Sequence, residues 1–193
     1  MKKLFLLVLI FAVMGTTAFA ADFLKFPDSI KPGTIMISPA FKLGSFYGLE
    51  TSVGATVAVD YALGINFPLT VGGEVGFITV SNVSLSTIPI LARAQYHPDL
   101  GVPNLDVYAT LKLGFNIVMM DETGWGSASG GFAYGSNVGG RYFFSKQIGV
   151  FAELGYDYAP VSYKIDLGPY LGSWSYSEYI YTFLTLGVTF KVK

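Results

Sequence analysis

Residues 105–117 show the clearest pattern in the chain, a strict alternation of apolar and polar positions. The apolar set is Leu105, Val107, Ala109, Leu111, Leu113, Phe115 and Ile117, and Asp106, Tyr108, Thr110, Lys112, Gly114 and Asn116 lie between them. A period of two places these sets on opposite faces of a β-strand, whereas a helix would spread the polar set around its circumference. A strand tilted by about 45° crosses a bilayer in about 9–11 residues, so this segment is long enough to cross one.

Seven further segments have strand character, and together with 105–117 they predict an all-β fold, an eight-stranded antiparallel up-and-down transmembrane β-barrel. The predicted strands cover about 34–42, 51–61, 69–80, 87–97, 105–117, 131–143, 148–158 and 178–192. Short connections are predicted near Gly64, Pro98 and Ser145, and the longest loops at 81–86, 118–130 and 159–177. Pro39, inside the first strand, predicts a bulge or an interrupted pairing because proline cannot donate to a ladder.

The first 33 residues lie outside the predicted barrel, which covers 34–193. Residues 1–20 are typical of a cleaved signal peptide, with Lys2 and Lys3 before an apolar run and Ala18-Phe19-Ala20 as the cleavage site. Residues 21–33 contain two prolines and no alternation, which predicts an irregular periplasmic lead-in. A plug or a strand-like extension is the alternative for this segment.

The composition favours a membrane barrel over a soluble domain. Hydrophobic residues make up 52% of the chain and charged residues 13%, against about 25% charged in an average protein. After the signal peptide no apolar run approaches the length of a membrane-spanning helix. The net charge of −1, which becomes about −3 without Lys2 and Lys3, gives no indication of a nucleic-acid partner. The absence of cysteine excludes thiol catalysis, thiolate metal sites and disulfides.

Aromatic residues recur near the predicted strand ends. One predicted girdle contains Tyr61, Tyr96, Tyr142 and Phe190, and the other contains Phe77, Phe115, Phe132, Tyr134 and Tyr156. The two interfaces of a bilayer select such girdles, and outer-membrane barrels keep short turns in the periplasm and long loops outside. We therefore expect an outer-membrane protein with both termini in the periplasm, the alternative being a secreted soluble barrel or sandwich.

The opposite faces of the predicted strands carry charged side chains. The predicted lumenal charge network consists of Asp60, Glu74, Arg93, Asp106, Lys112, Arg141, Glu153 and Asp157. The lumen of an eight-stranded barrel is just wide enough to be filled by side chains, so charges inside must pair. We expect Arg93 to bond to Glu74 or Asp106, Arg141 to Glu153, and Lys112 to an acid on a neighbouring strand. Such a network predicts a largely plugged lumen, and a gated or narrow ion pathway is the alternative.

Other candidate chemistry is sparse. The single histidine, His97, precedes Pro98 and is expected to be a turn or interface residue, so no enzyme, cofactor or metal site is predicted. Asp121 and Glu122 could touch a divalent cation, although paired loop acids are usually solvated. The loop candidates for surface recognition are Trp125, Tyr170, Trp174, Tyr176 and Tyr179, which could equally belong to the outer girdle.

With these features the chain resembles the small eight-stranded outer-membrane barrels, the group of outer membrane proteins A (its membrane domain), X and W and the opacity-type proteins. The resemblance is one of pattern and implies no catalytic motif. Those families end on an aromatic residue read by the assembly machinery, whereas here Lys191, Val192 and Lys193 follow Phe190.

The resemblance leaves two functions open. The first is a monomeric structural or surface-interaction barrel, with membrane lipid, lipopolysaccharide-type lipid, the assembly machinery and host or surface ligands as partners. The second is a small porin or hydrophobic-solute channel. Glycines on the inward faces of three predicted strands favour the channel, because a residue without a side chain leaves part of the lumen unfilled. These glycines are residues 72, 76, 135, 139, 149 and 155.

Overall fold

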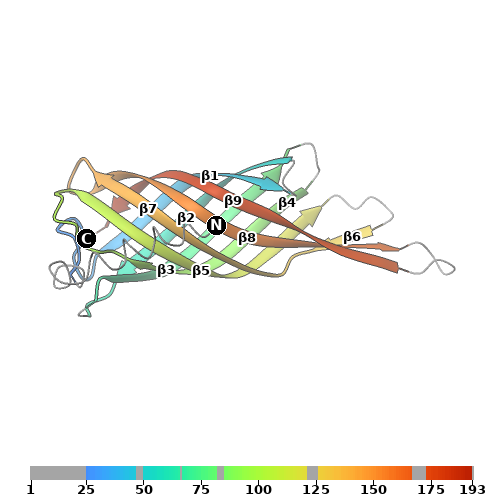
Figure 1. Ribbon diagram of the computed structural model, residues 1–193, viewed down its shortest axis with the longest axis horizontal. Coiled ribbons are helices and arrows are strands. Elements are labelled where there is room, and N and C mark those ends of the chain that lie inside the picture. Colours follow the sequence, from blue (N-terminus) through green and yellow to red (C-terminus); the bar gives the residue numbers. More distant parts are fainter. Residues whose placement is uncertain are drawn as a thin grey trace, which may run out of the picture.

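The computed structural model describes residues 25–46, 50–65, 67–81, 85–120, 126–166 and 173–192, and these form a closed antiparallel barrel (Figure 1). The strands in these ranges are β1 (Ile35–Phe46), β2 (Glu50–Ala62), β3 (Leu69–Val80), β4 (Leu85–Tyr96), β5 (Leu105–Met120), β6 (Gly126–Ser129), β7 (Phe132–Phe143), β8 (Ile148–Asp166) and β9 (Ser173–Lys191). Neighbouring strands pair in chain order, with β6 left out, and pairing of β9 with β1 closes the eight-stranded barrel. The predicted fold class is confirmed.

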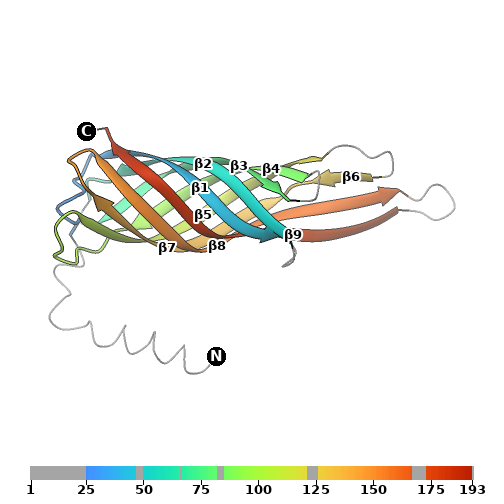
Figure 2. The ribbon, with the colours of Figure 1, turned by 90° about the horizontal axis from the view of Figure 1, so that it is seen from above.

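The main departure from the predicted strands is at one end of the barrel. Strands β8 and β9 each span 19 residues and stay paired as far as Asp166 and Ser173, beyond the ends of the other strands (Figure 2). Strand β6 pairs with this extension at residues 162–165. The predicted loops at 118–130 and 159–177 were therefore wrong in part. Strand alternation continues past Tyr158, with Ala159, Val161 and Tyr163 on one face and Pro160, Ser162 and Lys164 on the other.

Two bulges give the barrel local irregularity, and neither is at Pro39. The β1–β2 register runs through Pro39 unbroken, while the β1–β9 ladder skips Ser38 and Pro39 and resumes in the same register, which is an interrupted pairing. The shifts occur at Leu43/Gly44 and between Leu154 and Asp157. At the second shift the backbone N–H of Tyr156 donates to the side-chain oxygen of Asn137, 3.0 Å away, so the bulge leaves this group satisfied.

The polarity of the two wall faces is the reverse of a soluble protein. On β2, Val57 and Val59 are 44% and 46% exposed on the outside, while Asp60 is completely buried on the inside. On β5, Leu111 and Leu113 point outward and Lys112 inward. An apolar exterior around a polar interior is stable only in an apolar solvent, as expected for transmembrane strands. No helix in the described ranges is long and apolar enough to span a membrane.

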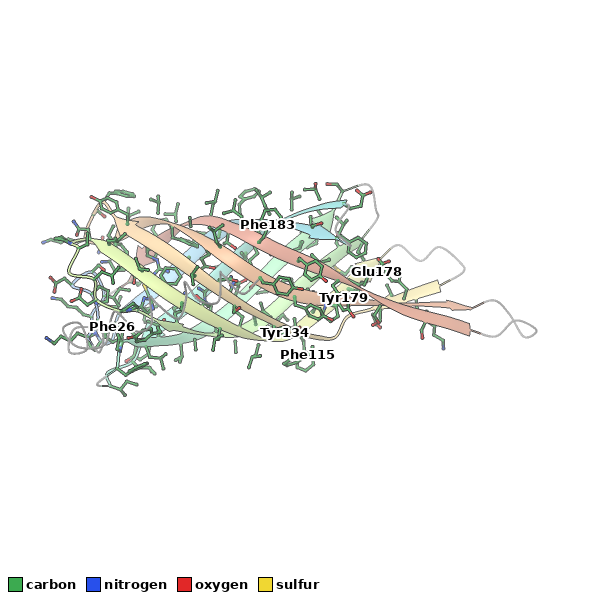
Figure 3. All side chains as sticks on the ribbon, in the orientation of Figure 1. Phe26, Phe115, Tyr134, Glu178, Tyr179 and Phe183 are labelled. Atoms are coloured by element: carbon green, nitrogen blue, oxygen red, sulfur yellow. The ribbon has the colours of Figure 1, made fainter. Side chains whose placement is uncertain are left out.

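The predicted girdle residues lie on the outer face at two levels. Tyr61, Tyr96, Tyr142 and Phe190 each pair with the first residue of an adjacent strand, at the end of the barrel where β1 begins. We call this the terminal end, and the opposite one the loop end. Towards the loop end lie Phe77, Phe115, Phe132, Tyr134 and Tyr156, all at least 43% exposed. Figure 3 shows Phe115 and Tyr134 there, with Tyr179 nearby, for which a place in the outer girdle was one of the two expectations.

The inward glycines do not leave empty lumen where aromatic side chains fill the space beside them. A Cβ atom added to Gly139 would lie 2.6 Å from Cζ of Tyr108, and one added to Gly149 would lie 2.8 Å from Cδ1 of Phe143. Gly139 and Gly149 therefore do not widen the lumen.

The substitution Gly139→Ala is expected to lower the free energy of unfolding by about 1–3 kcal/mol, the usual cost of overpacking. Urea titration of the refolded barrel, followed by its gel mobility, would measure this. The adjacent Gly140→Ala is the matched control, because no atom lies within 4 Å of the added Cβ. Equal stability of the two variants would contradict the filled space beside Gly139.

Candidate functional site: the barrel lumen

The lumen contains a buried ionic cluster at mid-height, and Glu74 on β3 is its centre. Its carboxylate bonds to Lys42 of β1, lies 2.9 Å from Nη1 of Arg93 on β4, and lies 3.3 Å from Nζ of Lys112 on β5. The side chain of Glu74 is 2% exposed. Three cations around one carboxylate offset the cost of taking that charge out of water.

The other acids of the cluster form ion pairs with Arg93 and Lys112. Arg93 reaches Asp60 of β2 through Nε at 3.1 Å and Glu153 of β8 through Nη2 at 3.2 Å. Lys112 lies 3.1 Å from Asp157 and 3.5 Å from Glu153. Because these ion pairs join β1, β2, β3, β4, β5 and β8, the cluster crosses the lumen.

Neutral side chains complete the cluster. The Tyr108 hydroxyl donates to Glu153 at 3.1 Å. The amide nitrogen of Asn137 lies 3.4 Å from Glu153 and 3.2 Å from Asp157. Asn137 thus ties the bulge in β8 to the charges beside it, so wall geometry and ionic cluster depend on each other.

A second hydrogen-bond chain lies nearer the terminal end and contains His97, which is completely buried. Nδ1 of His97 lies 2.8 Å from Asp106, and Nε2 lies 3.0 Å from the Thr70 hydroxyl. Asp106 also accepts from Arg141 at 2.9 Å. His97 lies in the connection after β4, as expected of a turn residue, but its side chain points into the lumen, so the interface alternative was wrong. Thr70, His97 and Asp106 form a hydroxyl–imidazole–carboxylate chain like that of a catalytic triad. All three side chains are completely buried, so none of them is exposed to a substrate.

The terminal end of the lumen is closed by the segment before β1. Ile30 is 1% exposed and packs with Met36, Ala62 and Phe143, and Phe26 lies against this group (Figure 3). Backbone bonds from Gly33 to the Ala62 carbonyl (2.9 Å) and from the Ala62 N–H to Thr34 (2.9 Å) fix the segment to β2. The described part of the lead-in therefore forms a stopper, which we define as residues 25–34.

The loop end of the lumen is closed by apolar side chains. The cluster consists of Phe46, Ile78, Val80, Leu85, Ala159, Val161 and Ile180, each at most 6% exposed, with Val118, Ala128 and Tyr163 packed against it. Strands β8 and β9 contribute Val161 and Ile180 from the base of their extension. From one end to the other the described lumen is thus apolar, ionic and apolar.

The structure places all eight predicted network residues inside the barrel, each at most 6% exposed. Arg93 meets Glu74, one of its two expected partners, but Arg141 bonds to Asp106 rather than Glu153. The acids around Lys112 lie on β3 and β8, which do not flank β5, so a neighbouring-strand partner was wrong. A barrel brings distant strands face to face, and neighbour arguments miss these contacts.

Lys42 is the network member that the prediction missed. It is 2% exposed and bonds to Glu74 and Asp157. The signal was present, because Phe41 and Leu43 on either side are exposed and apolar, which puts Lys42 in the inward register.

Most of the predicted recognition residues cannot be placed. Trp125 and Tyr170, like Asp121 and Glu122, lie outside the described residues. The backbones of Trp174 and Tyr176 belong to β9, and their side chains are outside the described part. Tyr179 lies within β9, not at a loop tip, and its ring centroid is 4.5 Å from that of Tyr158.

Comparison with known proteins supports the fold. No family model matches the sequence, and no curated protein matches it. Among solved structures, the chain is similar to Neisserial surface protein A (NspA), with 16% identity and a TM-score of 0.57 over 82% of this chain and 96% of that one. It is also similar to outer membrane protein AlkL in lipid bilayers, with 19% identity and a TM-score of 0.57 over 92% of this chain and 97% of that one. A third similar structure is that of outer membrane protein OprG from Pseudomonas aeruginosa, with 11% identity and a TM-score of 0.54 over 83% of this chain and 96% of that one.

The substitution Arg93→Met is expected to destabilise the barrel by about 3–5 kcal/mol, because it leaves buried carboxylates without their shared cation. Urea unfolding of the refolded protein would measure the loss. Lys164→Met, which removes an exposed charge from the β8 extension, is the control and should change stability by less than about 1 kcal/mol. If both variants unfold at the same urea concentration, the ionic cluster does not stabilise the fold.

Proposed function

Since the chain has the fold of the small eight-stranded outer-membrane β-barrels, we propose that it is an outer-membrane protein with an occluded lumen and a structural or surface-interaction role. The observation that carries this proposal is the layered lumen, in which the ionic cluster around Glu74 lies between the stopper and the apolar cluster at Phe46. A solute would have to break buried ion pairs and displace packed apolar side chains to pass.

The orientation follows from the connections. The longest hairpin, β8–β9, lies at the loop end, and the β7–β8 turn at 144–147 lies at the terminal end; the other connections do not separate by length, since 97–104 at the terminal end is longer than 47–49 and 81–84 at the loop end. Outer-membrane barrels place short turns in the periplasm. The terminal end is then periplasmic, both chain termini are periplasmic, and residues 1–20 are the signal peptide for export.

Surface interaction would use the loop end. The β8–β9 extension, to which β6 is paired, reaches beyond the ends of the other strands in both views (Figures 1 and 2). Its serine- and tyrosine-rich sequence, with Trp174 and Tyr176 in β9 and Tyr170 before it, is typical of adaptable recognition surfaces. Host or surface ligands would meet the barrel here, while lipid surrounds the wall and the assembly machinery inserts it.

One observation favours a second candidate, a small porin or hydrophobic-solute channel. The buried hydroxyls of Ser52, Thr56 and Thr87 have no hydrogen-bond partner within the described part of the protein. Buried hydroxyls normally bond to water when protein partners are missing. A file of water beside β2 and β4 is the feature on which a conducting state would depend.

Single-channel recording from the refolded chain, residues 21–193, in a planar bilayer separates the two candidates. The occluded barrel is expected to pass no current while running as a folded, heat-modifiable band on a gel. Reproducible current steps that change with Arg93→Ala or Lys112→Ala would overturn the occluded lumen and make the ionic cluster a conduction site.

Cysteine labelling tests the stopper separately, because the chain has no native cysteine. Ala62→Cys is expected to resist a membrane-impermeant maleimide, since Ala62 is completely buried beneath Ile30. Adding Ile30→Asp should make it reactive, by placing a charge among apolar side chains and dislodging the segment. Lys146→Cys, at an exposed turn, is the positive control. Equal labelling of Ala62→Cys with and without Ile30→Asp would show that the segment does not seal the lumen.

A further inference from the structure

A polar cleft lies at the terminal end, outside the lumen. It has a volume of about 830 Å³ and separates the stopper from the turns beside it. Its walls are residues 28, 29 and 31–34 of the stopper, Asn104 before β5, the β7–β8 turn at 145–147, and Lys191 at the end of β9. Four chain segments therefore converge on one cavity that neither the barrel closure nor the lumen uses.

The cleft carries an excess of positive charge. Lys31, Lys146 and Lys191 line it, against one carboxylate, that of Asp28. Lys31 and Lys146 are exposed, and neither has an acidic partner among the described residues. Lys191 donates to the Ser29 carbonyl at 2.8 Å and lies 3.8 Å from the centroid of the Phe143 ring, which leaves further donors on its ammonium group.

Two hydroxyl groups in the walls also have unused hydrogen-bonding capacity. The Ser145 hydroxyl oxygen accepts from the backbone N–H groups of Gln147 (3.2 Å) and Ile148 (2.9 Å), so its own proton is left to donate elsewhere. The Ser29 hydroxyl is buried and has no partner in the described structure. Three ammonium groups with two hydroxyl donors suit a compact oxyanion with several acceptor oxygens.

The cleft lies where the lipid-facing band ends. Tyr142, Phe144 and Val192 are at least 51% exposed on the outer wall beside it, and Ile35 is 37% exposed at the start of β1. The level at which an apolar band gives way to lysines is the level of lipid headgroups. An oxyanion in the cleft could therefore keep acyl chains on the adjacent wall.

We propose that this cleft binds a phosphoryl group, and that its source is the headgroup of an anionic phospholipid in the leaflet at the terminal end. The lysines and hydroxyls would contact the phosphate oxygens, and Asp28 would oppose binding. This site is independent of whether the lumen conducts.

Native mass spectrometry of the refolded barrel in a nonionic detergent, with phosphatidylglycerol added, tests the proposal. Wild type is expected to retain one such lipid, and diacylglycerol, which lacks the phosphate, should not be retained. The double variant Lys31→Gln/Lys146→Gln should weaken retention roughly ten-fold or more, at about five-fold per charge near a lipid surface. Asp28→Asn should strengthen it, and Lys164→Gln, at the other end of the barrel, should leave it unchanged.

Competition with inorganic phosphate distinguishes a lipid headgroup from free phosphate as the source of the phosphoryl group. If the lipid stays bound in millimolar phosphate, the acyl chains contribute to binding and the headgroup source is supported. If phosphate displaces the lipid, the cleft recognises the phosphoryl group alone, and the lipid source is overturned. Equal retention by the double variant and Lys164→Gln, in samples that show the same heat-modifiable folded band, would overturn the proposed site.

Discussion

The width of the lumen is the constraint on which the rest of the structure depends. Eight strands enclose a space that side chains can fill, so an inward charge has little water around it and must find an opposite charge. Five buried carboxylates and four lysine or arginine side chains meet this demand within the described barrel. His97, bonded to Asp106, is the other group there that can carry positive charge.

This constraint makes the ionic cluster a set of ties across the barrel. The bonds from Lys42 to Glu74 and Asp157 join β1 to β3 and β8, which backbone ladders leave unconnected. Such contacts fix the shape of the section as well as the register of neighbouring strands. The apolar layers at either end keep the cluster away from bulk water, where its ion pairs would be weaker.

Much of the fold follows from alternation alone, because burial on one side and lipid on the other act on every strand. The segment 105–117 is a strand in the structure for this reason, with Asp106 and Lys112 inside. The β8–β9 extension was missed because its serine, tyrosine and glycine content indicated a loop, although Ala159, Val161 and Tyr163 continue the alternation and belong to the apolar cluster or pack against it. Alternation indicates which residues point inward, but it does not fix their position along the barrel axis or their partners. For this reason the predicted partner of Arg141 was wrong and the burial of His97 was missed.

The lumen, the outer wall and the two ends of the barrel differ in how freely their side chains can change. Inside the barrel most of the charged side chains have two or more partners, so a change at one requires changes at others. The outer wall needs only to be apolar, and its valines and leucines distinguish lipid from water but not one ligand from another. In the proposed function, specific recognition is therefore assigned to the two ends, where polar side chains meet solvent. The loop end offers aromatic and serine-rich strands and the terminal end offers lysines, so the two ends suit ligands of different chemistry.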